Sequence, residues 1–255
     1  NNMDGSQILI GPANDTILKS TLMINDVIKN TTLPVCCGEK VRAQYKLYLP
    51  NKEIIEKDND FILGLSEFGG TFDSAIVGMT AGGKRTFILK AIEPKAALKN
   101  FDSAQVEISL LNFDNIIDQS KVKIFDESFS YTVPLLCGDK VSFDLKITQP
   151  NGEELLKDHN ISMQLGDSNQ FPIIFSYSLF NKTAGGSRVV LTPAKYLDNF
   201  LTKLDIRHIN EADYLLLEFS NINNITLNDN IAKLQKSKIV PKATQPMNGV
   251  NNKND

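Results

Sequence analysis

The chain contains the same pattern twice, roughly one hundred residues apart. The run Cys37–Val41 (CGEKV) returns as Cys137–Val141 (CGDKV), and the run Thr80–Arg85 (TAGGKR) returns as Thr183–Arg188 (TAGGSR). A repeat of about one hundred residues is long enough to close its own hydrophobic core. The sequence therefore predicts two domains in tandem, of which one can perform a function that the other has lost.

The composition is that of a globular protein. The 255 residues are 42% hydrophobic and 22% charged, which is sufficient for two modest cores. The net charge is −3, and the 27 basic and 30 acidic residues are interspersed without a basic stripe, so we expect no nucleic-acid partner. No apolar run approaches the roughly 18 residues of a membrane-spanning helix, so we expect no transmembrane segment.

Two features bear on the cellular compartment. The chain begins at Asn1 with polar residues, which is typical of a mature end after removal of a signal or anchor, and also of a fragment boundary. We therefore expect a bacterial periplasm or cell envelope, with the cytoplasm as the alternative. The three cysteines, Cys36, Cys37 and Cys137, lack framework or C-x-x-C spacing, which argues against a disulfide scaffold, a zinc site and a redox motif.

The first copy alternates polar and apolar residues in the manner of half-buried strands. A polar break at Lys57–Asp60 is expected to separate a return strand that begins at Ile54–Ile55 from a short apolar strand. The other expected strands are Leu18–Ile28, Val41–Leu49, Phe61–Gly64, Lys84–Leu89 and Ala104–Leu111.

One segment of this copy changes to a helical period. Apolar residues at i, i+3, i+4 and i+7 predict a two-turn helix with one buried stripe, formed by Phe72, Ala75, Ile76 and Met79. Thr71 is placed to cap this helix, and Asp73 lies in the first turn, where the macrodipole favours an acid. Each copy is therefore expected to be an α+β domain, with one short helix packed on a curled antiparallel sheet.

The second copy repeats this order with a weaker helical stripe. Its expected segments are Val141–Thr148, Ile161–Gly166, the helix near Phe175–Phe180, Val189–Leu191 and Tyr214–Phe219. We place domain 1 at residues 1–116, domain 2 at residues 117–222 and an Asn-rich flexible tail at residues 223–255, because the tail is poor in apolar residues.

In the first copy, Gly38–Val41 precedes a strand that carries a tyrosine, Phe61–Gly64 follows, and Gly78–Arg85 comes after the helix. This order of motifs resembles the FKBP family of peptidyl-prolyl cis-trans isomerases. The resemblance covers about Leu18–Leu110 and Lys121–Phe219. It implies two tandem FKBP-like domains, each a half-barrel sheet wrapped on its helix with an aromatic-lined pocket between them.

The resemblance also implies the pocket residues of the first copy. Tyr45 on the first long strand and Phe72 as the aromatic floor would be the catalytic positions. Phe68-Gly69, before the helix, would bind the substrate carbonyl through a backbone amide. The remaining substrate-binding positions are Ile55, Glu56, Phe61 and Val106. Pro-containing polypeptides are the implied clients, with a macrolide as a further ligand.

The sequence departs from the family pattern in three places. Ile55 and Glu56 stand where Phe and Asp are usual, and Lys90–Ser103 is too short for the flap that carries another tyrosine. In the second copy Leu145 replaces the tyrosine and Pro172 enters the loop before the helix. The second copy therefore resembles a retained fold with a lost site.

Rotation about an X-Pro bond needs no nucleophile, metal or cofactor, because the barrier comes from amide resonance. We therefore expect none, and we predict a folding helper that isomerises prolyl bonds through domain 1. The main alternative is a non-catalytic FKBP-like scaffold or interaction module. A tandem β-sandwich adhesin would fit the strand content, but it leaves the helical stripe unexplained.

Each site residue also has a plain structural interpretation. Phe61 and Phe72 fit an ordinary hydrophobic core, and Glu56 fits a solvated turn. Lys84 and Arg85 are most simply the solvated end of a strand. Only the joint order of these residues supports the functional interpretation.

Overall fold

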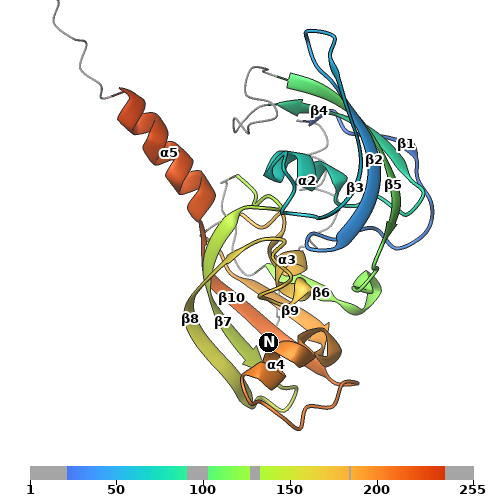
Figure 1. Ribbon diagram of the computed structural model, residues 1–255. Helices are drawn as coiled ribbons and strands as arrows, with labels where there is room; N and C mark the ends of the chain where they lie inside the picture. The colour runs from blue at the N-terminus through green and yellow to red at the C-terminus, as the bar shows by residue number, and fades with distance from the viewer. Residues whose placement is uncertain (1–21, 91–102, 127–132, 184, 239–255) are drawn as a thin grey trace, which may run out of the picture.

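The computed structural model describes residues 22–90, 103–126, 133–183 and 185–238, which form two five-stranded antiparallel sheets (Figure 1). The strand order is β1-β4-β5-β2-β3 in the first sheet and β6-β9-β10-β7-β8 in the second. These orders are equivalent, because each sheet uses its strands in the same sequence. The predicted α+β class and the two tandem sheet-and-helix domains are confirmed.

The long central strands of domain 1 carry the candidate site. β2 (Lys40–Tyr48) lies between β5 (Ser103–Phe113) and β3 (Ile54–Ile62), and β4 (Lys84–Lys90) joins β5 to the short edge strand β1 (Asn25–Ile28). The residues of β2 alternate between buried and exposed. One face of the sheet therefore covers the core while the other faces solvent.

The return strand is longer than the sequence indicates. β3 runs without a break through Lys57–Asp60, and Asp60 pairs with Arg42 while Lys57 pairs with Tyr45. β3 is an edge strand with β2 as its neighbour, so it accommodates polar and charged side chains that a central strand would not. At the other edge, the predicted strand Leu18–Ile28 is observed as Asn25–Ile28, and its first residues lie outside the described part of the chain.

The predicted helix of domain 1 is α2 (Gly70–Ile76). Its N-cap is Gly69, at φ 95°, and no side chain caps it, so the predicted capping role of Thr71 is wrong. The chain enters the helix by a turn that only glycine adopts without strain, which places Thr71 inside the first turn. Asp73 lies in the first turn as predicted, and the stripe residues Phe72, Ala75 and Ile76 are fully buried.

Domain 2 repeats this arrangement and adds short helices. Its strands are β6 (Lys123–Asp126), β7 (Lys140–Thr148), β8 (Glu154–Gln164), β9 (Arg188–Pro193) and β10 (Tyr214–Asn224). Its core helix is α3 (Ile173–Leu179), and the sequence did not predict the 3-10 turns η2 (Gln119–Lys121) and η3 (Ala194–Leu197) or the helix α4 (Asp198–Lys203).

The segment after β10 differs from the prediction. Residues 225–238 of the expected flexible tail form the helix α5 (Ile225–Lys238), which projects away from domain 2 in Figure 1. The Lys140 backbone N–H donates to the Thr226 hydroxyl at 2.8 Å, which fixes the start of α5 against β7. The rest of the expected tail, residues 239–255, lies outside the described residues. Within the part described, no helix is long and apolar enough to span a membrane.

Each domain buries an arginine at the end of its core helix. Arg85 is 2% exposed, donates to the carbonyls of Ala75 (2.7 Å) and Val77 (3.0 Å), and pairs with Asp26 at 2.7 Å. The expectation of a solvated strand end is therefore wrong for Arg85. Arg188 repeats the arrangement in domain 2, with Asp126 as its partner at 2.8 Å. A cation is favourable there because the last carbonyls of a helix carry partial negative charge.

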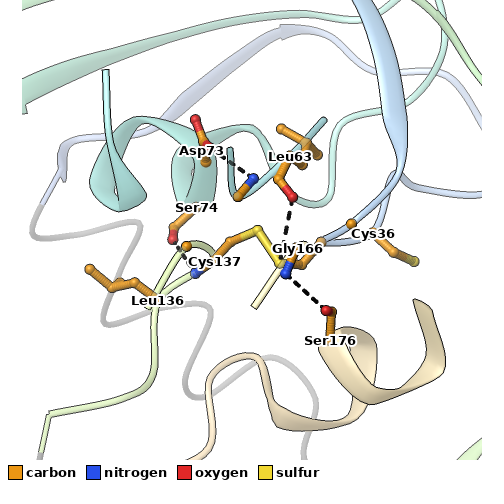
Figure 2. The surroundings of a disulfide bond; sticks show 12 residues. Cys36, Leu63, Asp73, Ser74, Leu136, Cys137, Gly166 and Ser176 are labelled. Carbon is orange, nitrogen blue, oxygen red and sulfur yellow. Dashed lines mark hydrogen bonds between the residues drawn. A yellow bond between two sulfur atoms is a disulfide. The ribbon is translucent and has the colours of Figure 1, made fainter. Parts of the chain in front are cut away.

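A disulfide between Cys37 and Cys137 joins the two domains (Figure 2). The sequence argued against a disulfide scaffold, and the structure corrects this. The two cysteines are 100 residues apart, so no local spacing marks them, but they occupy equivalent turns that meet where the domains pack. Cys36 stays a free, buried thiol, and burial raises its pKa, which makes it a poor nucleophile.

Candidate functional site

Four aromatic residues of domain 1 meet between the sheet and α2. Tyr45 comes from β2, Phe61 from β3, Phe72 from α2 and Phe68 from the loop that precedes α2. The Tyr45 and Phe72 ring centroids are 5.3 Å apart, and Phe61 lies 6.1 Å from Tyr45 and 6.3 Å from Phe72. We call these four residues the ring cluster. The structure thus brings together the two predicted catalytic residues and two of the predicted substrate-binding residues.

Three rings of the ring cluster are almost closed to water, and Phe61 is partly buried. Phe72 is 0% exposed, Tyr45 is 3% exposed and Phe68 is 5% exposed. The Phe68 ring lies 5.0 Å from Phe72 and 5.9 Å from Tyr45, so it fills the space beside both. In this conformation the rings pack as a core, and Phe68 is one of the rings that cover Phe72.

The loop that carries Phe68, residues Gly64–Gly70, is held from inside domain 1 by Asp73. The backbone N–H groups of Gly64 and Ser66 donate to the Asp73 carboxylate at 2.7 and 3.0 Å, and the Ser66 hydroxyl also bonds to it. Asp73 is fully buried, so these charge-assisted hydrogen bonds are made away from water. We call this segment the Phe68 loop, and Asp73 sets its path.

Tyr45 keeps its proton throughout the physiological range. Burial is the main cause that raises the pKa of its phenol to about 12; the carboxylates of Glu67 and Asp73 add to this, and a hydrogen bond with the Asn59 side chain partly opposes it. The neutral hydroxyl is therefore available as a hydrogen-bond donor.

The remaining predicted residues divide into two groups. Val106 is fully buried on β5, Ile55 is half-buried against the core, and Gly69 forms the turn into α2. Glu56 is exposed on the outer face of the sheet, where it pairs with Lys46 at 3.9 Å, so the structure does not bring it to the ring cluster. The predicted shortening of the flap concerns Lys90–Ser103, and its interior, residues 91–102, lies outside the described residues.

Sequence reasoning missed Phe87 on β4. Its ring centroid lies 5.8 Å from that of Phe72, and the residue is 1% exposed. The alternating pattern of β4 marked Phe87 as an inward residue, because Phe87 and Leu89 are buried at spacing two. Phe87 therefore supports the floor of the ring cluster.

A hollow of domain 1 lies on the outer face of the sheet, and Tyr45 is the one member of the ring cluster that lines it. It has a volume of about 730 Å³ and is lined mainly by polar and charged residues, among them Lys46, Glu56, Lys84 and Glu107. Phe61, Phe68 and Phe72 do not line it. Its mixed charge and position make it unlike an apolar pocket for a proline ring.

Domain 2 has a different set of rings at the equivalent place. Phe175 on α3 takes the place of Phe72, and Phe171, in the preceding loop, lies 6.2 Å from it. Phe200 of the extra helix α4 packs on Phe175 at 5.2 Å. Leu145 stands at the tyrosine position and is buried, so this cluster offers no hydroxyl. Among the described residues, no group of three or more His, Cys, Asp or Glu side chains could hold a metal ion.

Two curated proteins are similar to this chain, whereas no protein-family model matches it. A protein of Rickettsia conorii is 32% identical and one of Rickettsia felis is 34% identical, each over 225 residues. The similarity covers 80% of this chain and 67% of each relative. Both relatives carry the name "Putative peptidyl-prolyl cis-trans isomerase".

Solved structures give weaker similarities. The three FKBP domains of a wheat protein match with a TM-score of 0.32 and 13% identity, over 78% of this chain and 94% of that chain. A peptidyl-prolyl cis-trans isomerase of Pseudomonas syringae matches with a TM-score of 0.31 and 17% identity, over 40% of this chain and 90% of that chain. The sequence relationship to the Rickettsia proteins is the stronger of the two kinds of similarity.

Proposed function

Because the chain belongs to the FKBP-type peptidyl-prolyl cis-trans isomerase family, we propose that domain 1 binds Pro-containing polypeptides and accelerates rotation about the X-Pro bond. The observation that carries this proposal is the meeting of Tyr45, Phe61 and Phe72 in domain 1. Domain 2 has Leu145 in place of the tyrosine, so domain 1 is the better candidate for the site.

The chemistry that we propose is stabilisation of the twisted amide. Resonance makes the planar imide polar, and the barrier of about 18–20 kcal/mol falls when the bond is held in a less polar, twisted form. An apolar lining of aromatic rings favours that form over the planar one. The neutral Tyr45 hydroxyl would hold a neighbouring carbonyl, and the backbone at Phe68-Gly69 would offer an amide.

The value of this activity to a client is kinetic. Uncatalysed X-Pro isomerisation takes tens to hundreds of seconds and can limit folding. An enzyme that speeds it would act as a folding helper on slowly folding clients, with domain 2 holding the client or packing against domain 1.

The experiment is refolding of a protein whose rate is limited by proline isomerisation, with and without this chain. We expect acceleration by the wild type and its loss in Phe72→Leu, which keeps most of the buried volume. Phe175→Leu makes the same change in domain 2 and should leave the activity intact. Equal rates with wild type, Phe72→Leu and no added protein would remove the enzymatic proposal.

A non-catalytic module is the second candidate, and the closed ring cluster favours it. Phe72 has no exposed surface and Phe68 covers it, as in an ordinary core. A chemical-shift titration with an Ala-Pro peptide distinguishes the two candidates, because a module of this kind predicts no shifts at Tyr45 or Phe72. A macrolide titration with the same readout tests for a pocket independently of turnover.

We also propose that the protein works in an oxidising compartment, such as a bacterial periplasm or cell envelope. The buried Cys37–Cys137 bond supports this, because disulfides persist outside the reducing cytosol. The test is to block free thiols during lysis and to count the cysteines that have been blocked. In an oxidising compartment, Cys36 is the one blocked thiol of the three cysteines, whereas three blocked thiols would place the protein in the cytoplasm.

A further inference from the structure

The Phe68 loop carries one ring of the ring cluster, and domain 2 contacts both of its ends. At Gly64 the two backbones approach so closely that a Cβ atom would lie 2.4 Å from the carbonyl oxygen of Leu165. At Gly70 a Cβ atom would lie 3.0 Å from the carbonyl oxygen of Cys137. Two glycines thus allow domain 2 to pack directly on the backbone of the loop.

Hydrogen bonds fix domain 2 in this position. The Cys137 backbone N–H donates to the Ser74 hydroxyl on α2 at 2.8 Å, as Figure 2 shows. The Gln164 side-chain amide donates to the carbonyls of Gly138 (3.2 Å) and Gly64 (3.4 Å). The contact therefore reaches from the first residue of the Phe68 loop to the helix that carries Phe72.

The contact is nearly symmetric between the two copies. A Cβ atom on Gly166 would lie 2.4 Å from the carbonyl oxygen of Leu63, which mirrors the approach of Leu165 to Gly64. In the same manner, the Gly64 N–H donates to Asp73 in domain 1 and the Gly166 N–H donates to Ser176 in domain 2. Equivalent loops therefore face each other across the contact.

The disulfide lies at the centre of this contact. Cys37 and Cys137 are 1% and 0% exposed, and Cys137 is the residue whose carbonyl meets Gly70. The bond links the turn before β2 to the part of domain 2 that touches the Phe68 loop. The bond keeps domain 2 in contact with the Phe68 loop even when the noncovalent contacts fluctuate, because the linked groups stay at high effective concentration.

We propose that domain 2 positions the Phe68 loop through the Cys37–Cys137 bond. While the bond is intact, Phe68 covers the ring cluster, which is the candidate peptide pocket. When the bond is broken, the loop moves and the pocket opens. The use of the opened pocket rests on the proposed function, but the positioning of the loop does not. A dithiol would open the bond by exchange: it gives two electrons and two protons to the two cysteine sulfurs, which become thiols, and is itself oxidised to a disulfide.

The first measurement is amide hydrogen exchange in the full chain. We compare wild type with the double variant Cys37→Ala, Cys137→Ala, and Cys36→Ala is the matched control, because it removes a buried neighbouring cysteine and keeps the bond. We expect exchange over residues 64–70 to increase in the double variant by more than exchange in β2 and β5, which reports the loss of global stability, and we expect no such excess in Cys36→Ala. An increase over residues 64–70 no greater than the increase in β2 and β5 would overturn the proposal.

The second measurement is binding of an Ala-Pro peptide, followed by chemical shifts at Tyr45 and Phe72. We expect the double variant to bind at least about fivefold more tightly than wild type, the lower end of ordinary coupling between sites. Phe68→Ala should bind equally well with the bond intact or absent, because its loop no longer carries the closing ring. Should Phe68→Ala still respond to loss of the bond as wild type does, Phe68 is not the closing group and the proposal is overturned.

The two proposals fail in different ways. Faster exchange over residues 64–70 without peptide binding by any variant, Phe68→Ala included, supports the positioning of the loop and removes the prolyl-peptide function. If the double variant does not fold, wild type treated with a small dithiol under native conditions replaces it, with the thiol count as the measure of reduction. The same exchange criterion then decides the proposal.

Discussion

Buried charged residues show most clearly what a single side chain does in this protein. Arg85 and Arg188 each join the end of a core helix to an acid on an edge strand, Asp26 or Asp126. The guanidinium donates several hydrogen bonds in fixed directions, so it satisfies carbonyls that would otherwise be buried without partners. One residue thereby fixes both the end of α2 and the position of β1.

We predict that Arg85→Met destabilises the protein by about 3–5 kcal/mol, because it leaves Asp26 and two helix carbonyls without their partner. The measurement is the urea midpoint at unchanged m-value. Arg42→Met is the matched control, since Arg42 pairs with Asp58 at 2.9 Å on the exposed face and should cost about 0–1 kcal/mol. Equal losses in the two variants would contradict the structural role of Arg85.

The raised pKa of Tyr45 predicts that the stability of the protein falls at alkaline pH. Its pKa is raised from 10.0 to about 12 by burial, so folding favours the protonated phenol. The resulting stability is fully present below pH 10 and is lost as the pH rises through about 12. Tyr45→Phe should therefore shift alkaline unfolding, followed by circular dichroism, to higher pH, whereas Tyr214→Phe, at a site 39% exposed, should not. Identical curves for wild type and Tyr45→Phe would contradict this.

At the scale of elements, α2 depends on its loop as much as on its own residues. The helix is seven residues long, has no side-chain cap, and begins at a glycine with positive φ. A helix this short is not stable alone, so packing and the loop must hold it. Asp73 provides this connection by accepting hydrogen bonds from the backbone N–H groups of Gly64 and Ser66.

Domain 2 supplies the matched variant for this contact. Ser176 on α3 accepts the Gly166 N–H at 2.9 Å, as Asp73 accepts the Gly64 N–H at 2.7 Å. We predict that Asp73→Ala costs about 1–3 kcal/mol for each buried N–H left unpaired. Asp73→Ser should cost less, because a hydroxyl can still reach Gly64. Thermal unfolding measures both, and an equal loss in both variants would show that the hydrogen bond to Gly64 contributes nothing.

At the scale of the whole molecule, the two domains behave as one unit. Their buried apolar residues form a single cluster, and the disulfide joins positions 100 residues apart. A covalent link across a loop of this length restricts the unfolded chain and stabilises the fold by about 4–5 kcal/mol in the chain-entropy model. The domains are therefore expected to unfold together.

We predict one cooperative urea transition for the wild type under non-reducing conditions. The variant Cys37→Ala, Cys137→Ala should unfold at a clearly lower midpoint, with a loss of up to about 4–5 kcal/mol, because the unfolded chain regains its freedom. Cys36→Ala should stay close to wild type, since it keeps the link. A double variant as stable as Cys36→Ala would show that the disulfide does not stabilise the native state.

The sequence was sufficient for much of the architecture. The repeat predicted two domains, alternation predicted most strands, and the stripe from Phe72 predicted α2, because each of these signals is local and periodic. The family followed from the order of motifs and is confirmed. The roles of Tyr45 and Phe72 in catalysis stay predictions, although the structure places the two rings 5.3 Å apart.

Tertiary structure alone decided the features that join distant segments. The Cys37–Cys137 bond, the burial of Arg85 and the seating of Phe68 against Phe72 each depend on a partner that no local pattern identifies. From the sequence alone, a side chain at the end of a strand is expected to be solvated, but the end of α2 covers Arg85. By itself, the sequence therefore determined which elements form and in what order. Only the packing of these elements decided which residues meet, because contact energies depend on residues that are distant in the sequence and become neighbours only when the chain folds.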